Sequence, residues 1–278
     1  MLVETHLDGF IRDKVAISID RLKAMEPEEG YYLAFSGGKD SQCAYHLAKE
    51  AGVKFDAHYN LTTVDPPELV RFIEANYPDV IIDHPPRTMW RLIETKGLAN
   101  RWSRYCCEHL KERGGEGRIC ITGVRWAESD SRKKRKAFEI VTSKKENKKL
   151  FNDNDEGRRL FENCMQKGKR VVNPIIDWLD EDVWEYIHSR NLEYCKLYDE
   201  GHTRLGCIGC PLAGGESMKE AFETWPKYKE NYIRAITRFL PGYLQRCQKR
   251  NAKPFRDTVD GWFNLVGGRA YKRRNRLQ

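Results

Sequence analysis

The sequence predicts an α/β protein built on a doubly wound, parallel, five-stranded sheet with a helical carboxyl-terminal extension. Three observations favour this fold class. Short apolar runs alternate with amphipathic segments of helical length, which is the pattern of right-handed crossover units. A glycine-rich turn lies directly between the first apolar run and a helical segment. The length of 278 residues suits one large domain with an appendage.

Each element has its own pattern in the sequence. Five short apolar runs are expected to form strands, at residues 31–35, 54–61, 80–82, 119–121 and 171–176. Segments with apolar residues at helical spacing are expected to form helices, at residues 1–25, after 41, from 67, 89–95, 181–187 and 219–239. Asp65 and Asp180 are predicted to cap two of these helices. Because ligands of such sheets bind at the carboxyl ends of the strands, the turns there are the candidate site.

These elements suggest a division of the chain into three parts. Residues 1–28 are expected to form an amino-terminal helix, residues 29–215 a nucleotide-binding domain, and residues 216–278 a basic helical extension. A polar insertion is expected within the domain at residues 131–169. Between positions 131 and 149 it holds nine lysines and arginines against Glu139 and Glu146. Such a segment is typical of a solvated loop on the active-site side.

Composition narrows the class of protein. The 49 lysines and arginines against 41 acidic residues leave a net charge of +8, which suits a polyanionic partner such as a nucleotide or a nucleic acid. The nine cysteines are an odd number without a secretory signal, so we expect a cytoplasmic protein with reduced thiols. No apolar stretch is long enough for a membrane span.

The turn after the first predicted strand has the features of a phosphate-binding loop. It reads Ser36-Gly37-Gly38-Lys39-Asp40-Ser41. Glycine lets the backbone approach a ligand closely, and the N–H groups at the start of the following helix suit an anion. Lys39 adds a positive charge, and the hydroxyls of Ser36 and Ser41 can donate to phosphate oxygens. Asp40 could cap the helix or hold a magnesium ion.

Four cysteines form two local pairs. Cys106 and Cys107 are adjacent, and Cys207 and Cys210 form a C-x-x-C pair 100 positions later. A C-x-x-C turn can place two thiolates on one metal, whereas adjacent cysteines fit a single tetrahedral zinc poorly. A cubane with irons at separate corners tolerates that divergence better, so an iron–sulfur site and a zinc site are both open. The other cysteines are expected to be packing residues, namely Cys43, Cys120, Cys164, Cys195 and Cys247.

The loop and the cysteine pairs together resemble the phosphoadenosine phosphosulfate reductase family of the adenine-nucleotide alpha-hydrolase superfamily, which has a Rossmann-like fold. The resemblance covers about residues 31–212 and includes the branch with a vicinal cysteine pair and a distant C-x-x-C. Further segments are also similar to the family, at residues 122–129 with Arg132, 173–178, 182–184, 197–201 and 205–207.

The resemblance implies roles for particular residues. Cys106, Cys107, Cys207 and Cys210 would ligate a [4Fe–4S] cluster. The loop from Ser36 to Ser41 would grip the phosphates of ATP or a related adenine nucleotide, with magnesium as a compatible ion. Thr62, Gly123, Arg125 and Arg132 would line the nucleotide site. Lys39, Asp40 and Arg125 would form its catalytic set.

Two features of the sequence bear on the reaction. The loop is complete, which favours ATP, and no cysteine follows Cys247 where a sulfonucleotide reductase carries its nucleophile. The leading hypothesis is therefore an enzyme that splits ATP into an adenylate and pyrophosphate and transfers sulfur to the adenylated acceptor at the cluster. One alternative is reduction of adenylyl sulfate, or its 3′-phosphorylated form, to sulfite by an external thiol. Another is a nucleotide-responsive iron–sulfur module of a larger nucleic-acid-modifying assembly.

The partners expected on this basis are an adenine nucleotide and a sulfur donor or external thiol reductant. The basic segments are compatible with binding to a nucleic acid. A homodimer is also compatible with the sequence.

Overall fold

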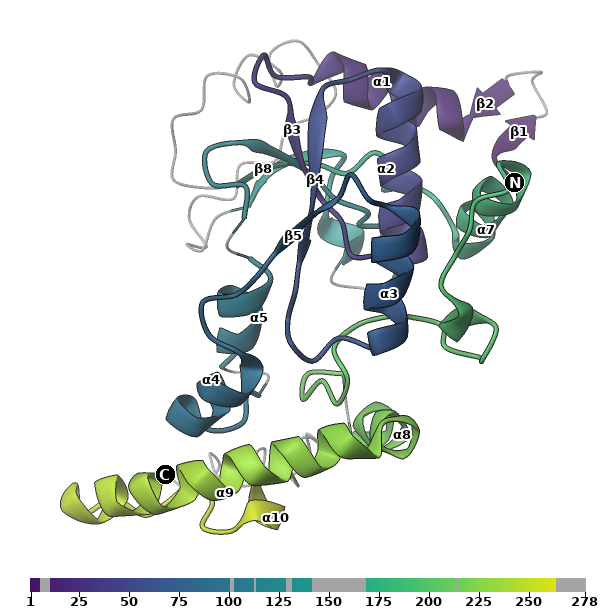
Figure 1. Ribbon diagram of the computed structural model, residues 1–278. Helices are drawn as coiled ribbons and strands as arrows, with labels where there is room; N and C mark the ends of the chain where they lie inside the picture. Colours follow the sequence, from purple (N-terminus) through teal and green to yellow (C-terminus); the bar gives the residue numbers. More distant parts are fainter. Residues whose placement is uncertain are drawn as a thin grey trace. The chain divides into compact units, whose positions relative to one another are not determined.

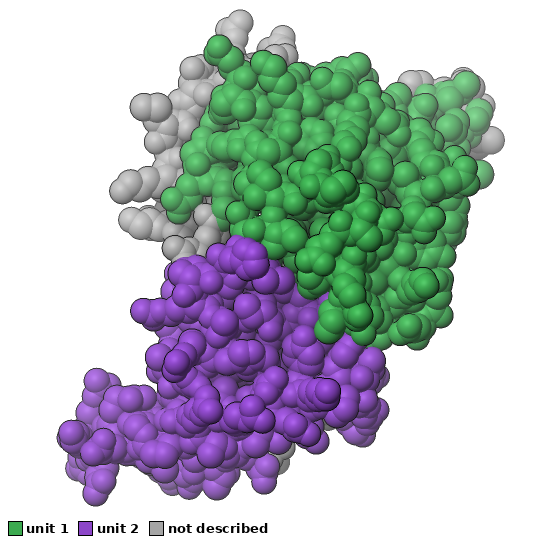
Figure 2. All heavy atoms as spheres, in the orientation of Figure 1, with its two compact units in different colours: residues 1–60, 67–83, 114–205 green, residues 61–66, 84–113, 206–278 purple. Residues whose placement is uncertain are grey.

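The computed structural model describes residues 1–5, 11–100, 103–112, 114–128, 132–141, 169–213 and 215–263. Two compact units make up the chain (Figure 2). The first contains residues 1–60, 67–83 and 114–205, and the second contains residues 61–66, 84–113 and 206–278. Most of the expected basic insertion, with Cys164, and the last fifteen residues of the chain lie outside the described residues.

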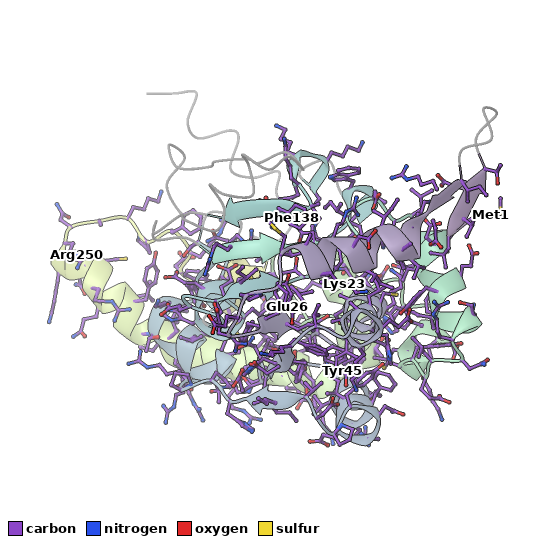
Figure 3. The ribbon with its side chains drawn as sticks, turned by 90° about the horizontal axis from the view of Figure 1, so that it is seen from above. Met1, Lys23, Glu26, Tyr45, Phe138 and Arg250 are labelled. Carbon is purple, nitrogen blue, oxygen red and sulfur yellow. The ribbon has the colours of Figure 1, made fainter. Side chains whose placement is uncertain are left out.

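The first unit is organised around a six-stranded sheet with the strand order β5-β4-β3-β6-β8-β7 (Figure 1). Its strands are β3 (Tyr31–Ala34), β4 (Phe55–Asn60), β5 (Ile81–Asp83), β6 (Ile119–Ile121), β7 (Phe138–Val141) and β8 (Lys169–Val172). The five predicted strands are confirmed and pair in parallel. The strand β7 was not predicted. It pairs antiparallel with β8 at the edge of the sheet, and Phe138 marks it in Figure 3.

Helices of the first unit pack beside this sheet. They are α1 (Lys14–Ala24), α2 (Lys39–Ala51), α3 (Pro67–Asn76) and α7 (Asp180–Ser189), with short 3-10 helices η1 (Trp126–Glu128), η2 (Arg132–Lys134) and η4 (Lys196–Tyr198). Figure 1 shows α2 and α3 running alongside β3, β4 and β5. The prediction that Asp180 caps α7 is wrong. Leu179 precedes the helix, Asp180 is its first residue, and the carboxylate of Asp182 accepts from the Leu179 N–H at 2.7 Å.

The beginning of the chain differs from the expected continuous helix. Two short strands, β1 (Val3–Thr5) and β2 (Ile11–Asp13), pair antiparallel before α1 begins. The Asp13 side chain ends the second strand and caps α1, because it accepts from two N–H groups of the first turn at 2.9 and 3.0 Å. The helix is therefore confirmed only for residues 14–24.

The second unit is helical. It contains α4 (Met89–Lys96), α5 (Tyr105–Leu110), α8 (Gly215–Thr224), α9 (Pro226–Lys249) and α10 (Val259–Phe263). Its core is formed by apolar side chains from these helices and the short segment 61–66, among them Val64, Ile93, Tyr232 and Trp262. The helices predicted over residues 219–239 are confirmed, and α9 continues ten residues further. No described helix is long and apolar enough to span a bilayer.

Candidate active site

The anion loop, residues 36–41, lies between β3 and α2 in the first unit. Its conformation is held by its own hydroxyls. The Ser36 N–H donates to the Ser41 Oγ at 3.1 Å, and the Ser41 hydroxyl donates to the Gly38 carbonyl at 2.8 Å. Both serine hydroxyls are thus engaged within the turn, 3.0 Å from each other. The loop is therefore a closed turn at the amino-terminal end of a 13-residue helix.

Two glycines permit this packing. Gly37 has a φ of +71°, and a Cβ there would lie 2.6 Å from the Ile73 side chain. Gly123, in the turn after β6, would place a Cβ 2.7 Å from the carbonyl carbon and oxygen of Asp40. Gly123 thus brings the β6 turn against the first turn of α2. Its role seen in the structure is this close backbone approach.

Two buried cations share two carboxylates beside the loop. The Lys39 Nζ lies 2.8 Å from the Asp180 Oδ1 and 3.6 Å from the Asp40 Oδ2. The Arg125 guanidinium donates through Nε to Asp40 at 2.6 Å and through a terminal nitrogen to Asp180 at 2.8 Å. Lys39 and Arg125 are only 5 % and 2 % exposed, whereas the Asp180 side chain is 59 % exposed. The network is therefore open to solvent on the side of Asp180.

Asp180 is the carboxylate common to both cations. Desolvation opposes its charge, but the hydrogen bonds and charges of Lys39 and Arg125 outweigh this effect and lower the pKa of Asp180. It is therefore ionised at neutral pH. Asp180 partly neutralises the two cations. A phosphate that enters the loop would compete with this exposed carboxylate for both of them.

Tyr198, at the end of η4, contacts the loop directly. Its hydroxyl oxygen accepts from the Lys39 N–H at 2.9 Å. Burial raises the pKa of Tyr198, so the phenol stays protonated. This N–H is one of the donors that a helix amino terminus offers to an anion. This role of Tyr198 was not predicted, although the residue lies in segment 197–201, which is similar to the family.

Arg132 lies in a strongly basic environment. It forms an ion pair with Glu128. Burial and then the positive charges of Arg204, Arg135 and Arg125 lower the pKa of Arg132, while Asp40 opposes them. The two arginines expected to line the nucleotide site, Arg125 and Arg132, thus influence one another electrostatically. Such an accumulation of like charge favours an anionic ligand.

The cysteine group of the second unit consists of Cys106, Cys107, Cys207 and Cys210. Cys106 and Cys107 both lie within α5. A hydrogen bond with Cys107, burial and the charges of Cys107, Cys210 and Cys207 raise the pKa of Cys106. The same hydrogen bond, aided by the Arg104 guanidinium 3.8 Å from the Cys107 sulfur, lowers the pKa of Cys107. Of these two adjacent thiols, Cys107 is therefore the one that ionises first.

Lys111 is the cation of this group. The charge of Cys207, followed by that of Asp65 and a hydrogen bond to Cys207, raises the pKa of Lys111 against the effect of desolvation. Burial raises the pKa of Cys207, and the charge of Lys111 opposes that shift. A lysine beside thiols stabilises the thiolate form that metals bind. The sequence analysis did not single out Lys111.

Thr62 belongs to the second unit, which also contains the cysteine group. Its hydroxyl oxygen is 3.5 Å from the Cys207 sulfur, and its N–H donates to the Asp65 carboxylate at 2.6 Å. The contacts seen within its own unit are therefore with the cysteine group. The loop residues, Gly123, Arg125 and Arg132 all lie in the first unit.

The chain matches the model of a protein family over residues 30–213, the Phosphoadenosine phosphosulfate reductase domain. It belongs to this family. The resemblance based on the loop and the cysteines is thereby confirmed, and the members of the family are enzymes.

Relatives include two uncharacterized proteins of Methanocaldococcus jannaschii, each 26 % identical and matching 74 % of this chain. The chain spans less than half of their length, 47 % and 41 %. The adenosine 5′-phosphosulfate reductase of Oceanobacillus iheyensis is 28 % identical over 190 residues, which are 64 % of this chain and 68 % of that protein. Among solved structures, the phosphoadenylyl-sulfate reductase of Candida auris matches 68 % of this chain and 87 % of its own, with 16 % identity and a TM-score of 0.46.

Proposed function

We propose that the chain is an enzyme that binds ATP at the anion loop and cleaves it between the α- and β-phosphates. The observation that carries this proposal is the convergence of Lys39 and Arg125, both buried, on the amino-terminal turn of α2. A polyphosphate would meet these two cations together with the backbone N–H groups at the start of α2.

The proposed step is an in-line displacement at the α-phosphorus. An acceptor oxygen forms the new bond to this phosphorus, the bond to the bridging oxygen breaks, and pyrophosphate leaves with the electron pair. Negative charge accumulates on the leaving group, where Lys39 and Arg125 stabilise it after they exchange Asp180 for phosphate oxygens. Magnesium entering with the nucleotide would find Asp40 or Asp180 as a carboxylate ligand.

We extend the proposal to a [4Fe–4S] cluster held by Cys106, Cys107, Cys207 and Cys210. The chemistry of the donor set supports it, because four soft thiols influence one another and Lys111 favours their ionisation. Among the described residues, no three Cys, His, Asp or Glu side chains are placed to hold a single metal ion. The thiolates of a cubane bind separate irons, so they do not need to converge on one ion as the ligands of a zinc do. When bound, such a cluster would order the four thiolates and supply iron–sulfur chemistry for the transfer of sulfur to the adenylated acceptor.

Reduction of a sulfonucleotide is the second candidate. The identity of 28 % with the adenosine 5′-phosphosulfate reductase of Oceanobacillus iheyensis favours it. In this reaction two external thiols would become a disulfide while adenylyl sulfate yields AMP and sulfite. The same anion loop would then hold the nucleotide phosphate.

One experiment separates the two candidates. The full chain, purified without oxygen and with its iron and sulfide counted, is incubated with ATP or with adenylyl sulfate and dithiothreitol. With ATP and an acceptor that offers an oxygen, such as transfer RNA, we expect pyrophosphate and an equal amount of adenylylated acceptor, which releases AMP when sulfide is added as the sulfur donor. Sulfite from adenylyl sulfate, with no pyrophosphate from ATP, would overturn the first candidate and support the second. No binding of either nucleotide would overturn both.

A further inference from the structure

One exposed face of α9 carries a row of basic side chains. Residues four and three positions apart on a helix share a face, and this spacing aligns a set of cationic and amide residues. They are Lys227, Asn231, Arg234, Arg238, Gln245 and Lys249, here called the α9 stripe. The stripe extends over about 33 Å at 1.5 Å per residue. It is therefore longer than a mononucleotide.

The stripe borders a groove between α4 and α9 of the second unit. The groove has about 410 Å³ of empty space, including the part open to solvent, and is lined by Trp90 and Glu94 of α4 and by Asn231, Arg234, Ala235 and Arg238 of α9. The two helices lie close together over this region (Figure 1). A planar aromatic group, an amide and two guanidinium groups thus meet in one concave surface.

Trp90 is only partly packed into the core. Its ring meets Tyr232 edge-on at 5.1 Å and Tyr228 at 6.2 Å, and the remainder is available to the groove. A partly exposed indole beside arginines is suited to stacking on an unpaired base. The solvent-facing side of α9 is mostly polar. Its exposed large apolar side chain is Ile233, which is 39 % exposed. A lipid surface would require more apolar contact.

The charges of the groove leave a positive excess. Glu94 binds Arg91 at 3.0 Å and Arg238 at 2.9 Å. Among the ion pairs of the described residues, none involves Lys227, Arg234 or Lys249, and Glu230 is the acidic neighbour of the stripe on α9. Solvated cations in a row suit a chain of phosphates, because each neutralised phosphate releases a counterion.

We propose that the α9 stripe and its groove bind single-stranded nucleic acid, with the phosphates along Lys227, Arg234 and Lys249 and an unpaired base against Trp90. The length of the stripe favours a polymer over a free nucleotide, and the indole favours unpaired bases over a duplex. This site is separate from the anion loop and does not depend on the reaction catalysed there.

The test is fluorescence anisotropy of the full chain with a labelled 20-nucleotide oligo(U) between 50 and 200 mM salt. The double variant Lys227→Gln/Arg234→Gln should bind at least tenfold more weakly at 100 mM salt. Its slope of log Kd against log salt should be smaller by about 0.7 for each cation removed. Trp90→Leu should weaken binding about tenfold, and Trp90→Phe, which keeps a ring, should restore most of it. Circular dichroism checks that each variant is folded.

Lys229→Gln is the matched control, because Lys229 is exposed on the opposite side of the same helix. It should change affinity less than twofold. Equal losses for Lys229→Gln and the double variant would overturn the site. Duplex binding as tight as single-strand binding would overturn the stacking at Trp90. Binding to phosphatidylserine vesicles that depends on Arg234, without binding to oligo(U), would identify a membrane surface and overturn the proposal.

Discussion

The anion loop of the first unit takes its backbone from six consecutive residues, whereas the cysteine group of the second unit joins two pairs 100 positions apart. Their electrostatics differ as well. In the loop, Lys39 and Arg125 already have carboxylates within 2.8 Å. Beside the thiols, Lys111 is a cation whose pKa is raised chiefly by the charge of Cys207.

This difference shows two ways of preparing a site. In the loop, carboxylates already neutralise the cations before a ligand binds. A phosphate must therefore displace Asp180 and the Tyr198 hydroxyl from their donors. The cysteine group becomes negative only when its thiols ionise, so a metal centre would provide the compensating charge. The loop is thus expected to fold without ligand, whereas the electrostatics of the cysteine group depend on what it binds.

The largest expected effects separate the two regions by substitution. Lys39→Ala should lower pyrophosphate release about 10²–10³-fold, because it removes a cation from the leaving group, and should leave the iron content unchanged. Cys207→Ser should reduce the iron content from about four per chain to below about one, and should leave ATP binding unchanged. Iron analysis, the visible spectrum and a pyrophosphate assay measure these effects.

Two matched variants control for charge and sulfur. Lys23→Ala removes an exposed lysine of α1, and Cys247→Ser removes a partly buried cysteine of α9. Both should behave as the parent chain does. Loss of iron in Lys39→Ala would show that the regions are not independent, and four irons in Cys207→Ser would remove that residue from the ligand set.

A smaller effect is expected on stability at Gly123. Gly123→Ala would place a Cβ 2.7 Å from the backbone of Asp40, so the β6 turn and the first turn of α2 must separate. The free energy of unfolding should fall by about 1–3 kcal/mol. Urea denaturation measures it. In Gly206→Ala the added Cβ meets nothing within 4 Å, and the change should stay within about 0.5 kcal/mol. Equal stability of both variants would contradict the close packing at Gly123.

Much of this organisation could be predicted from sequence because its signals are local. The apolar runs gave the five parallel strands, and the loop between Ser36 and Ser41 lies between a strand and a helix as expected. The strand β7 was missed because Phe138 and Ile140 are embedded in a basic segment that is typical of a loop. The first 25 residues have helical spacing, but pairing of β1 with β2 replaces the helix before Lys14.

The parts that could not be predicted depend on tertiary contacts. Asp180 was predicted to be a helix cap, but it is the first residue of α7 and its carboxylate binds Lys39 and Arg125 from other segments. Tyr198 is 159 positions from Lys39, and no local pattern shows that its hydroxyl accepts the Lys39 N–H. Lys111 likewise reaches Cys207 only through the fold.

The smallest expected effect concerns the pH dependence of the balanced loop. Because the folded-state pKa of Asp180 is lowered, its ion pairs contribute stability above the unfolded-state pKa of about 3.9 and lose it as the pH falls through the folded-state value. Asp180→Asn should therefore lower Tm by about 2 °C equally from pH 8 to 5, a modest change because the carboxylate is largely exposed. This difference should shrink as the pH falls below the unfolded-state pKa and vanish below the folded-state pKa.

Pyrophosphate binding gives a second readout that a purely structural role would not change. Without the Asp180 charge, Lys39 and Arg125 are released from a competing carboxylate, so Asp180→Asn should bind pyrophosphate severalfold more tightly at pH 7. Asp20→Asn, on the exposed side of α1, is the control and should change neither Tm nor affinity. Weaker pyrophosphate binding in Asp180→Asn would show that Asp180 positions the cations for the ligand. It would contradict the competition between Asp180 and phosphate for Lys39 and Arg125.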